Sequence, residues 1–472
     1  MRQQIDGDSF LPLRLLSLLG LLAIAAAGCA PKPPAPATAV APMAAPLDPA
    51  LAAATFDSAW TLIDRNHFDP AHGGVDWQAV RDELRPRALM ATSRESLRAL
   101  LREMIARTGL SHFELIPGDV VDALRTSRDA DVLDAPEPEN AREGGVGLDV
   151  RLVGGELLVR RVEADSPAAR AGVQPGWVLA AIDTTDIGEV LDRTAGAVTD
   201  EILALRIVLL ARARLDGPLG SEVAVTLRAA AGDEREVVME RVRQPGVVNQ
   251  LGYLPPIRTR IEHELLVHDD LRVGLIAFNI WLLPIAAEFD AAIERYRDAD
   301  AVIIDLRGNL GGVGGMAMGL AGHFLTEPVS LGEMRTRQST LQFRVNPRRS
   351  NASGQRVQPF AGPVAILQDG LSVSTSEIFV RGLQCLGRAR VFGETSAGAA
   401  LPSRLERLPN GDVLQFAFAD FVDPQGIRLE GRGVIPDEEV PLARADLLAG
   451  RDAPLQAALA WISGYHSAVP AP

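Results

Sequence analysis

The segment Asp369–Glu377 contains three serines and ends in a carboxylate, a combination that could support nucleophilic chemistry. It follows an apolar run at 364–367 that is typical of a buried strand, and it precedes a predicted helix at 375–386. Ser374 would then lie beside the free N–H groups of a first helical turn, which favours an exposed nucleophile. The same spacing fits a capping box in which Ser374 caps the helix and Glu377 lies three residues on. The spacing alone therefore leaves a catalytic role and a capping role open.

A dense glycine loop follows another apolar strand. Residues 301–305 form this predicted buried strand, and five glycines occur within 308–315. Glycines let backbone amides approach a ligand closely. The loop lacks the Gly-Lys-Ser/Thr end of a P-loop, and its spacing does not fit the dinucleotide fingerprint. We therefore expect it to donate N–H groups to an oxyanion rather than to cradle a phosphate.

Two further segments carry groups that suit proton transfer. Ser111 and His112 are adjacent in Leu110–Glu114, and Glu430 lies in a glycine-rich segment at 429–437. The ordinary pKa of histidine lies near neutrality, which suits a general base. A single histidine is more often structural, however, and 429–437 by itself predicts only a strand followed by a turn.

The elements that must position these residues predict a multidomain α/β protein. Apolar residues recur at helical spacing over 51–115, and a polar, proline-containing linker occupies 119–143. From residue 271 onward, apolar strands alternate with helices, including helices at 284–297 and 313–325, which predicts right-handed crossovers and a site at the strand C-terminal ends. The predicted parts are a helical region at 51–118 that carries His112, a β domain at 144–245, an α/β core at 271–450, and a C-terminal helix and tail at 451–472.

Residues 144–245 resemble a PDZ domain in the order of their features. A glycine-rich loop precedes an alternating strand at 156–162, a short helix that begins at Ser166 and closing strands at 218–240, with an amphipathic helix inserted at 187–214. The resemblance implies that N–H groups of this loop bind a terminal carboxylate while the ligand chain pairs with an exposed strand. The loop residues are Gly145, Val146, Gly147 and Leu148. A packing domain with a closed groove is the alternative, and the nearby acidic Asp149 would oppose carboxylate binding.

With this PDZ-like block between them, the four segments resemble the C-terminal-processing, or tail-specific, serine peptidases and their relatives, the tricorn core proteases. The resemblance extends from about residue 55 to 450. Its most specific pieces are the Ser-x-Ser-Glu stretch at 374–377, the Asp-Leu-Arg-Gly-Asn-x-Gly-Gly loop at 305–312 and the strand end at 393–395. It implies a crotonase- or ClpP-like peptidase core and peptide or protein substrates that are bound through their C-terminal ends.

The chain departs from the main branch of this family at the general base. Those enzymes use a Ser/Lys dyad, with the lysine in a Gly-Glu-x-x-x-Gly-Lys segment, whereas the matching segment here, 393–399, ends in Ala399. Lys32 in the N-terminal tail is the only lysine among the 47 basic residues. Arginine stays protonated because its pKa is above 12. A Ser/Lys mechanism is therefore excluded.

The tricorn-like branch uses a tetrad of Ser, His, Ser and Glu instead. The resemblance assigns these roles to Ser374, His112, Ser111 and Glu430. It implies that Ser374 attacks the scissile carbonyl and that His112 accepts the proton and returns it to the leaving amine. Ser111 and Glu430 would orient and polarise the site, as the third group of a triad does. It further implies that the oxyanion is held by the N–H of Thr375 and by one from Gly311 or Gly312.

The first 29 residues have the features of an export signal. Basic residues precede an apolar run, Leu15–Ala27, that is shorter than the roughly 20 residues of a spanning helix. The run leads into a small-residue stretch that resembles a bacterial lipobox, which implies a lipid on Cys29; ordinary signal cleavage is the alternative. Residues 30–50 are rich in Ala and Pro and read as a tether. We expect an exported protein that is lipid-anchored on the periplasmic side of a bacterial membrane.

Charge and composition narrow the remaining choices. A net charge of −14 disfavours nucleic acid as a partner, because phosphate binding needs concentrated basic residues. The scattered histidines lack zinc-type spacing, so we expect neither a metal nor a cofactor. We predict a serine endopeptidase of the tail-specific type that acts on exported proteins or peptides. Two alternatives are a non-catalytic peptide- or lipid-binding protein on the same fold, and a scaffold that presents peptides to another protease.

Overall fold

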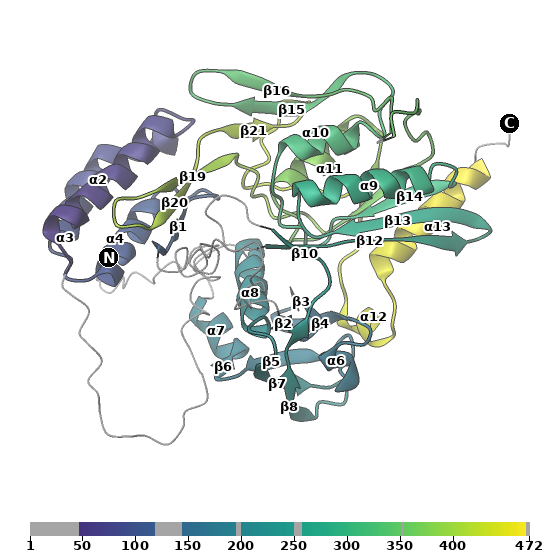
Figure 1. The fold of residues 1–472 in the computed structure, drawn as a ribbon, viewed down its shortest axis with the longest axis horizontal. Helices are drawn as coiled ribbons and strands as arrows, with labels where there is room; N and C mark the ends of the chain where they lie inside the picture. The colour runs from purple at the N-terminus through teal and green to yellow at the C-terminus, as the bar shows by residue number, and fades with distance from the viewer. Residues whose placement is uncertain (1–46, 119–143, 195–199, 250–256, 352, 469–472) are drawn as a thin grey trace, which may run out of the picture.

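The computed structural model describes residues 47–118, 144–194, 200–249, 257–351 and 353–468. The predicted signal with Cys29, most of the predicted tether at 30–50 and the predicted linker at 119–143 lie outside these residues. The described chain is a mixed α/β fold in three regions: N-terminal helices, a β-rich block and a larger α/β body (Figure 1). None of the described helices has the length and apolar composition needed to cross a bilayer.

The N-terminal region consists of three helices, α2 (Pro49–Asn66), α3 (Trp77–Leu89) and α4 (Arg94–Ala106), with a 3-10 turn, η1 (His72–Gly74), after α2. The predicted helical spacing is confirmed, because α2 buries Phe56 and Ile63 and α4 buries Leu97 and Leu101. The helical pattern was predicted to continue to about residue 115, but α4 ends at Ala106 and His112 lies in the loop that follows. Gly109 adopts a positive φ of 62° after α4, and the chain then leads into strand β1 (Glu114–Ile116).

Strand β1 ties this region to a distant hairpin. It pairs with β20 (Val413–Ala417), which in turn pairs with β19 (Ser403–Arg407). The helices α2 to α4, this small sheet and the side chain of Phe113 share one apolar core. Arg98 of α4 donates to the buried Asp412, from Nη2 at 2.8 Å to one carboxylate oxygen and from Nε at 3.1 Å to both. The loop that holds His112 is therefore fixed from both sides.

The middle block is built on an antiparallel sheet. Its core order is β3-β4-β5-β7-β8, and β6 pairs with β5. The predicted strand at 156–162 is confirmed as β4. The elements are β2 (Gly144–Gly145), β3 (Leu148–Val153), β4 (Glu156–Val162), α6 (Pro167–Arg170), β5 (Val178–Ile182), β6 (Thr185–Asp186), α7 (Ile187–Thr194), α8 (Asp200–Leu215), β7 (Glu222–Arg228), β8 (Glu234–Glu240) and β9 (Val242–Arg243).

The single amphipathic helix that was predicted at 187–214 is instead two helices, α7 and α8. Helix α8 is apolar on several sides because it packs between the sheet of this block and the α/β body. Its buried Leu205, Val208 and Leu209 belong to the same apolar cluster as Val373, the residue before Ser374, and Ala399. The block therefore rests directly on the segment that carries the candidate nucleophile.

The α/β body contains a six-stranded sheet in the order β12-β13-β14-β17-β18-β22. Strand β12 is antiparallel to β13, and the remaining neighbours are parallel, as the predicted alternation of strands and helices requires. The strands are β12 (Ile261–His268), β13 (Leu271–Phe278), β14 (Ala301–Asp305), β17 (Val364–Gln368), β18 (Arg390–Gly393) and β22 (Glu438–Glu439). The register pairs Asp305 with Leu367, so β14 and β17 end side by side.

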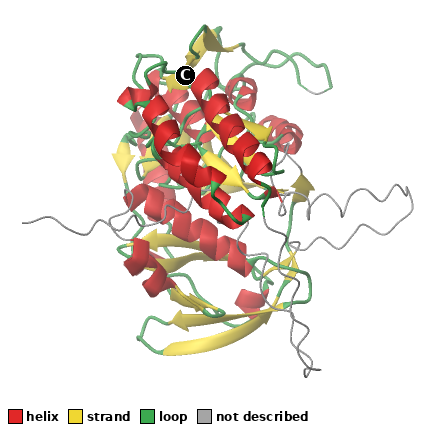
Figure 2. Ribbon diagram, turned by 90° about the vertical axis from the view of Figure 1, so that its left-hand side faces the viewer, coloured by secondary structure: helices red, strands yellow, loops and turns green. Residues whose placement is uncertain are grey.

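Helices cover both faces of this sheet. Figure 2 views the molecule from the side of the N-terminal helices. Helices α9 (Leu283–Arg295), α10 (Gly315–Ala321) and α11 (Thr375–Cys385) pack on the face that includes Ile304 and Ile366. Helix α13 (Ala453–Ala468) packs on the other face against Ile303 and Leu367. Predicted helices at 284–297, 313–325 and 375–386 correspond to α9, α10 and α11, with α10 shorter than expected.

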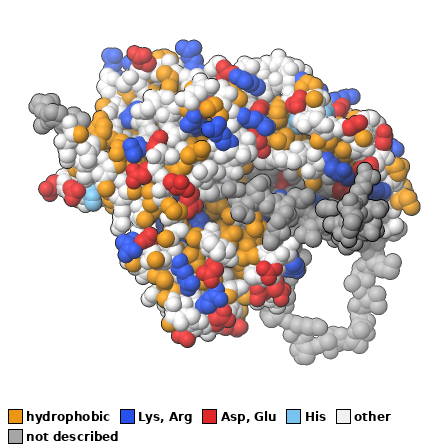
Figure 3. Space-filling model, turned by 180° about the vertical axis from the view of Figure 1, so that it is seen from behind, with side chains coloured by type: hydrophobic (Ala, Val, Ile, Leu, Met, Phe, Trp, Pro, Cys, Tyr) orange, Lys and Arg blue, Asp and Glu red, His pale blue; other side chains and the backbone are white. Residues whose placement is uncertain are grey.

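The remaining elements are small. They are a two-stranded ribbon of β10 (Val247–Asn249) and β11 (Ile257–Thr259), a three-stranded sheet of β16 (Thr340–Val345), β15 (Val329–Arg335) and β21 (Asp420–Val422), and the short helix α12 (Arg444–Leu448). Acidic and basic side chains are interspersed on the face seen in Figure 3.

Candidate active site

Ser374 lies at a strained turn between strand β17 and helix α11. Its backbone has φ 59° and ψ −113°, a conformation that costs a non-glycine residue on the order of 1–3 kcal/mol. A serine on a strained strand-to-helix turn projects its hydroxyl away from the surrounding backbone, as in a nucleophile elbow. The turn is held by the N–H of Val373, which donates to the carbonyl of Asn309 at 3.0 Å, and by the hydroxyl of Thr375, which donates to the carbonyl of Gly312 at 3.0 Å.

Glu377 holds this turn through a fully buried carboxyl group. Oε2 accepts from the N–H of Ser374 at 2.8 Å and of Ala399 at 3.1 Å, while Oε1 accepts from Ser396 Oγ at 2.7 Å and the N–H of Gly398 at 2.8 Å. Burial raises the pKa of Glu377 to about 7, although these donors oppose the shift. The side chain thus binds the turn of Ser374 to the segment that contains Ser396, Gly398 and Ala399.

The other three predicted residues of the tetrad are joined by hydrogen bonds. Ser111 Oγ donates to Glu430 Oε2 at 2.9 Å and lies 2.7 Å from His112 Nδ1, while the N–H of Ser111 donates to Glu430 Oε1 at 2.7 Å. Glu430 Oε2 also accepts from the N–H of Ala400 at 3.1 Å. The order Glu430, Ser111, His112 leaves the far nitrogen of the imidazole, Nε2, for a reacting group. It also connects residues that are 319 positions apart in the chain.

Burial shifts the pKa values of this group in defined directions. It lowers the pKa of His112 to about 4, so the imidazole is neutral at pH 7. It raises the pKa of Glu430, against the effect of the hydrogen bonds from Ser111. A general base must be unprotonated, and the neutral imidazole of His112 meets this requirement.

One cavity of about 1520 Å³ contains all four of these residues in its wall. Ser374 and Thr375 enter it from the body, Ser111 and His112 from the N-terminal region, and Glu430 from the segment after β21. Residues from three distant parts of the sequence therefore face one cavity, although among the described residues no hydrogen bond joins the Ser374 side chain to the other three.

The two glycines that were predicted as alternative oxyanion donors differ in the structure. The N–H of Gly311 already donates to Asn309 Oδ1 at 3.0 Å, so it is engaged within the loop. Gly312 lines the cavity, and its N–H has no acceptor among the described residues. Its φ of 141° and the carbonyl of Trp281, 2.4 Å from where a Cβ would stand, require glycine. Gly312 is thus the better-placed donor, together with Thr375 at the first position of α11.

The predicted PDZ-like loop borders the same cavity. Val146, Gly147 and Leu148 line it, whereas Gly145 lies in the short strand β2 and its carbonyl accepts from Gln244. Carbonyls of Val146 and Gly147 accept from the block itself, from Ala168 and Glu163. The N–H groups of Val146 and Gly147 have no acceptor among the described residues.

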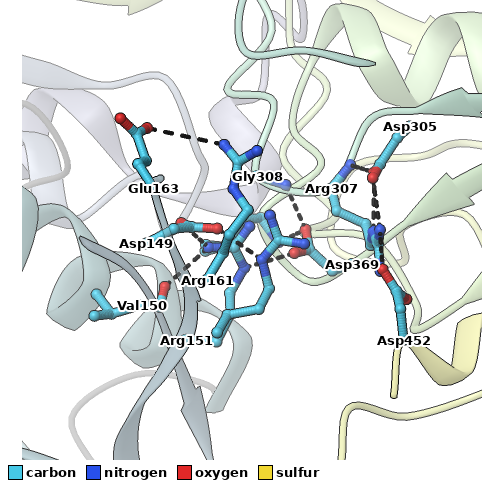
Figure 4. Close-up of polar contacts among 12 residues, drawn as sticks. Asp149, Val150, Arg151, Arg161, Glu163, Asp305, Arg307, Gly308, Asp369 and Asp452 are labelled. Atoms are coloured by element: carbon cyan, nitrogen blue, oxygen red, sulfur yellow. Dashed lines mark hydrogen bonds and ion pairs between the residues drawn. The ribbon is translucent and has the colours of Figure 1, made fainter. Parts of the chain in front are cut away.

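Asp149, which was expected to oppose a carboxylate near this loop, is itself neutralised. Its carboxylate accepts from Arg151 at 2.6 Å, Arg160 at 2.6 Å and Arg212 at 3.2 Å (Figure 4 shows Arg151 beside it). Burial acts to raise the pKa of Asp149, but the three guanidinium groups hold it well below its usual value.

Sequence reasoning missed several groups that hold these loops. Asp369 Oδ1 accepts from the N–H groups of Gly308 at 2.8 Å and Leu371 at 3.0 Å, and its Oδ2 accepts from Arg151 at 2.7 Å. Asn309 is fully buried and orders the glycine loop. An aspartate directly after a buried strand was the only local signal for Asp369. The described residues contain no group of three or more His, Cys, Asp or Glu side chains that could hold a metal ion.

Comparisons with known proteins identify the relatives of this chain. Residues 272–440 match the model of peptidase family S41, and residues 50–106 match the tricorn protease C1 domain. The chain is 26% identical over 420 residues to a carboxyl-terminal-processing protease of Synechocystis sp., covering 86% of this chain and 85% of the relative. It is 25% identical over 390 residues to the protease of the same name from Picosynechococcus sp., covering 81% and 82%.

A solved structure shows the same fold. The photosystem II D1 C-terminal processing protease superposes with a TM-score of 0.54 at 18% identity, over 83% of this chain and 93% of that one. The matches to both family models and to the named relatives support a relationship of this chain to the carboxyl-terminal-processing proteases. The chain is a serine peptidase, and its substrates are peptides or proteins.

Proposed function

We propose that this peptidase cleaves with a tetrad of Ser374, His112, Ser111 and Glu430 and processes the C-terminal ends of exported proteins or peptides. The observation that carries the proposal is the hydrogen-bonded series from Glu430 through Ser111 to His112, which opens into the same cavity as the strained Ser374. No lysine occurs in the described residues, so the neutral His112 is the base that the cavity offers.

In the first step, His112 accepts the proton of the Ser374 hydroxyl as the oxygen attacks the scissile carbonyl. Ser111 Oγ holds Nδ1 of the ring and is itself held by Glu430, which stabilises the imidazolium that forms. The N–H groups of Gly312 and Thr375 stabilise the developing oxyanion, and losing one such donor typically costs about a hundredfold to a thousandfold in rate. The imidazolium then protonates the leaving amine, and water hydrolyses the acyl-enzyme by the reverse sequence.

Covalent labelling by a fluorophosphonate tests this assignment. The wild-type protein is expected to react at Ser374, and Ser374→Ala is expected to abolish labelling and peptide hydrolysis. His112→Ala is expected to suppress both while the protein stays folded. His466→Ala is the matched control, because His466 lies on α13 and contacts the carbonyl of Asp300. Wild-type labelling in His112→Ala would contradict the tetrad, and an unlabelled but folded wild type would favour a binding protein.

We further propose that residues 144–245 act as a PDZ-like module that captures the C-terminal carboxylate of the substrate. The unpartnered N–H groups of Val146 and Gly147 border the cavity, and β3 is an end strand that a ligand chain can extend. The three arginines around Asp149 remove the repulsion that its charge would cause. A peptide substrate with a C-terminal carboxamide is then expected to show a higher KM than the same peptide with a free carboxylate. Equal KM values would contradict this role.

The proposed location is the periplasmic side of a bacterial membrane, with a lipid on Cys29. Its support is the sequence at the N-terminus, where an apolar run ends in small residues before a cysteine. Metabolic labelling with radioactive palmitate is expected to mark the wild-type protein and to spare Cys29→Ser. An unlabelled wild-type protein would leave ordinary signal cleavage as the alternative.

A further inference from the structure

The segment between β14 and α10 carries the proposed oxyanion donor, and its shape depends on a few fixed points. Asn309 donates from Nδ2 to the carbonyl of Phe278 at 2.8 Å, and Asn309 Oδ1 accepts from Gly311 at 3.0 Å. Gly311 in turn lies against Ser374, whose Cβ is 2.7 Å from where a Cβ of residue 311 would stand. A shift of this loop would therefore move the oxyanion donor and the nucleophile relative to each other.

Arg307 lies within the loop, and its guanidinium group is bound on two edges. Its Nε and Nη2 donate to the two carboxylate oxygens of Asp305, at 2.9 and 2.6 Å. Its Nη1 and Nη2 donate to the two oxygens of Asp452, at 2.7 and 2.9 Å. Figure 4 shows Arg307 between these two carboxylates.

The two carboxylates have different origins. Asp305 is the last residue of β14 and belongs to the same loop as Arg307. Asp452 comes from the C-terminal segment, directly before α13, where its Oδ1 also accepts from the N–H of Leu455 at 3.2 Å. Asp305 ties Arg307 to the sheet, whereas Asp452 joins it to α13, which packs on the other face of the sheet.

The contact is buried on the side of Arg307 and partly open to solvent on the side of Asp452. The Arg307 side chain is 7% exposed, and that of Asp452 is 38% exposed. Burial acts to lower the pKa of Arg307, yet the carboxylates of Asp305 and Asp452 raise it well above its usual value. Without Asp452 the guanidinium keeps Asp305 but loses its bond to the C-terminal segment, so it is free to turn toward solvent. Gly308 follows Arg307 in the chain, and its N–H is bound to Asp369, so a change at Arg307 can reach the nucleophile turn through Gly308.

We propose that Asp452 is a positioning residue for the hydrolysis: from the C-terminal segment it holds Arg307, and through Arg307 the loop that presents the oxyanion donor beside Ser374. The inference rests on the proposed function, because it requires that Gly312 donates to the oxyanion. Through Asp452, the segment after residue 450 would contribute to catalysis. The residue types and spacing of that segment do not predict such a role.

Two substitutions separate this role from helix capping. Asp452→Ser removes the carboxylate but keeps a capping hydroxyl, and Asp452→Asn keeps the size and one acceptor oxygen. Each is expected to lower kcat about tenfold to a hundredfold and to leave KM within about twofold. Asp452→Glu, which restores a carboxylate, is expected to recover part of kcat. Asp446→Asn is the matched control, because Asp446 binds Arg451 in the same region without contacting the loop.

The affinity for a peptide boronate, which forms a tetrahedral adduct with the serine, is the second measurement. A purely structural role of Asp452 would not change it selectively. The affinity of Asp452→Ser for the boronate is expected to fall by the same factor as kcat/KM, while its affinity for the product peptide stays unchanged. Active-site titration with the fluorophosphonate and circular dichroism correct for any unfolded fraction.

The outcomes distinguish the two proposals. If the wild-type protein hydrolyses peptide and needs His112, but Asp452→Ser and Asp452→Asn retain wild-type kcat, the positioning role of Asp452 is overturned. A parallel loss of boronate and product affinity would overturn it as well. If the wild-type protein is not labelled at Ser374, the proposed function itself fails, whatever the Asp452 variants do.

Discussion

Glu377 Oε2 accepts hydrogen bonds from the backbone N–H of Ser374 and from that of Ala399, so one carboxylate oxygen joins the candidate nucleophile to the segment that ends at Ala399. The capping interpretation and the catalytic interpretation of Ser374 are thus compatible. The glutamate that closes the capping box also fixes the strained turn. Its other oxygen fixes the segment that reaches Gly398.

The first prediction concerns Glu377→Gln. An amide places an NH₂ group opposite two of the four donors, so two hydrogen bonds are lost in a fully buried site. We expect a loss of stability of about 1–3 kcal/mol and, because the nucleophile turn relaxes, a fall in kcat of about tenfold to a hundredfold. Urea unfolding and steady-state kinetics measure the two effects. Glu406→Gln, at an exposed position on β19, is the control, and an unchanged kcat in Glu377→Gln would contradict the prediction.

The second prediction concerns the pH dependence of stability. Glu377 has a pKa of about 7 in the folded protein against an ordinary value of 4.5, so the folded state binds the proton more tightly than the unfolded state. Its contribution to stability is therefore complete below about pH 4.5 and is lost as the pH rises through 7. Between pH 5 and pH 8 we expect the free energy of unfolding of the wild type to fall relative to Glu377→Gln, by at most about 3 kcal/mol. Parallel curves for the two proteins would exclude the raised pKa.

The third prediction concerns the acid limb of activity. Because burial lowers the pKa of His112 to about 4, the imidazole stays unprotonated well below the ordinary histidine range. We expect kcat/KM to persist to about pH 5 and to fall with an apparent pKa near 4, measured while circular dichroism confirms that the protein is folded. An acid limb near 6.5 in the folded protein would show that the ring is more hydrated than the structure indicates.

The fourth prediction concerns the groups behind the histidine. Ser111→Ala and Glu430→Gln each interrupt the series that orients His112, and each is expected to lower kcat about tenfold to a hundredfold with little change in KM. Because the two residues act through each other, the double variant is expected to be little worse than either single one. Fully additive losses in a double-mutant cycle would indicate that they act separately.

The fifth prediction concerns Arg151 of the middle block. It pairs with Asp149 of the same block and with Asp369 of the nucleophile segment, so it joins the two parts. Its side chain is 6% exposed, so Arg151→Met leaves a buried aspartate without its partner and is expected to cost about 3–5 kcal/mol of stability. Arg161→Gln, whose parent side chain is 45% exposed, is expected to cost at most about 1 kcal/mol. Equal costs in urea unfolding would mean that the Arg151 pairs are as solvated as those at the surface.

The periodic parts of the fold could be predicted from the sequence, because burial on one face imposes a spacing. The strands β4 and β14 coincide with their predicted ranges, and α9 and α11 differ by a residue or two. The division of the predicted helix at 187–214 into α7 and α8 could not be predicted in the same way. Helix α8 contacts apolar neighbours on several sides. Such a helix lacks a regular polar face, so the sequence pattern does not show where it begins.

The site itself depended on contacts that local spacing does not encode. Ser111 and His112 could be selected from the resemblance to the tricorn core proteases, but their approach to Glu430 depends on the pairing of β1 with β20 and on the ion pair of Arg98 with Asp412. The choice between Gly311 and Gly312 required the orientation of Asn309. Arg307 pairs with Asp452, but a chain with 61 acidic and 47 basic residues allows many such pairs. Nothing near Asp452 in the sequence predicts this one.

The histidine and the serine of the proposed tetrad are next to different apolar cores. His112 is adjacent to Phe113 in the core shared by α2 to α4 and the hairpin of β19 and β20, whereas α11 packs in the core of the large sheet. The smaller core can lose its order while the larger one persists, since regions of a protein open with unequal free energies. On mild heating, the peptidase would then lose activity reversibly before it unfolds globally. The α/β body that carries Ser374 would stay folded.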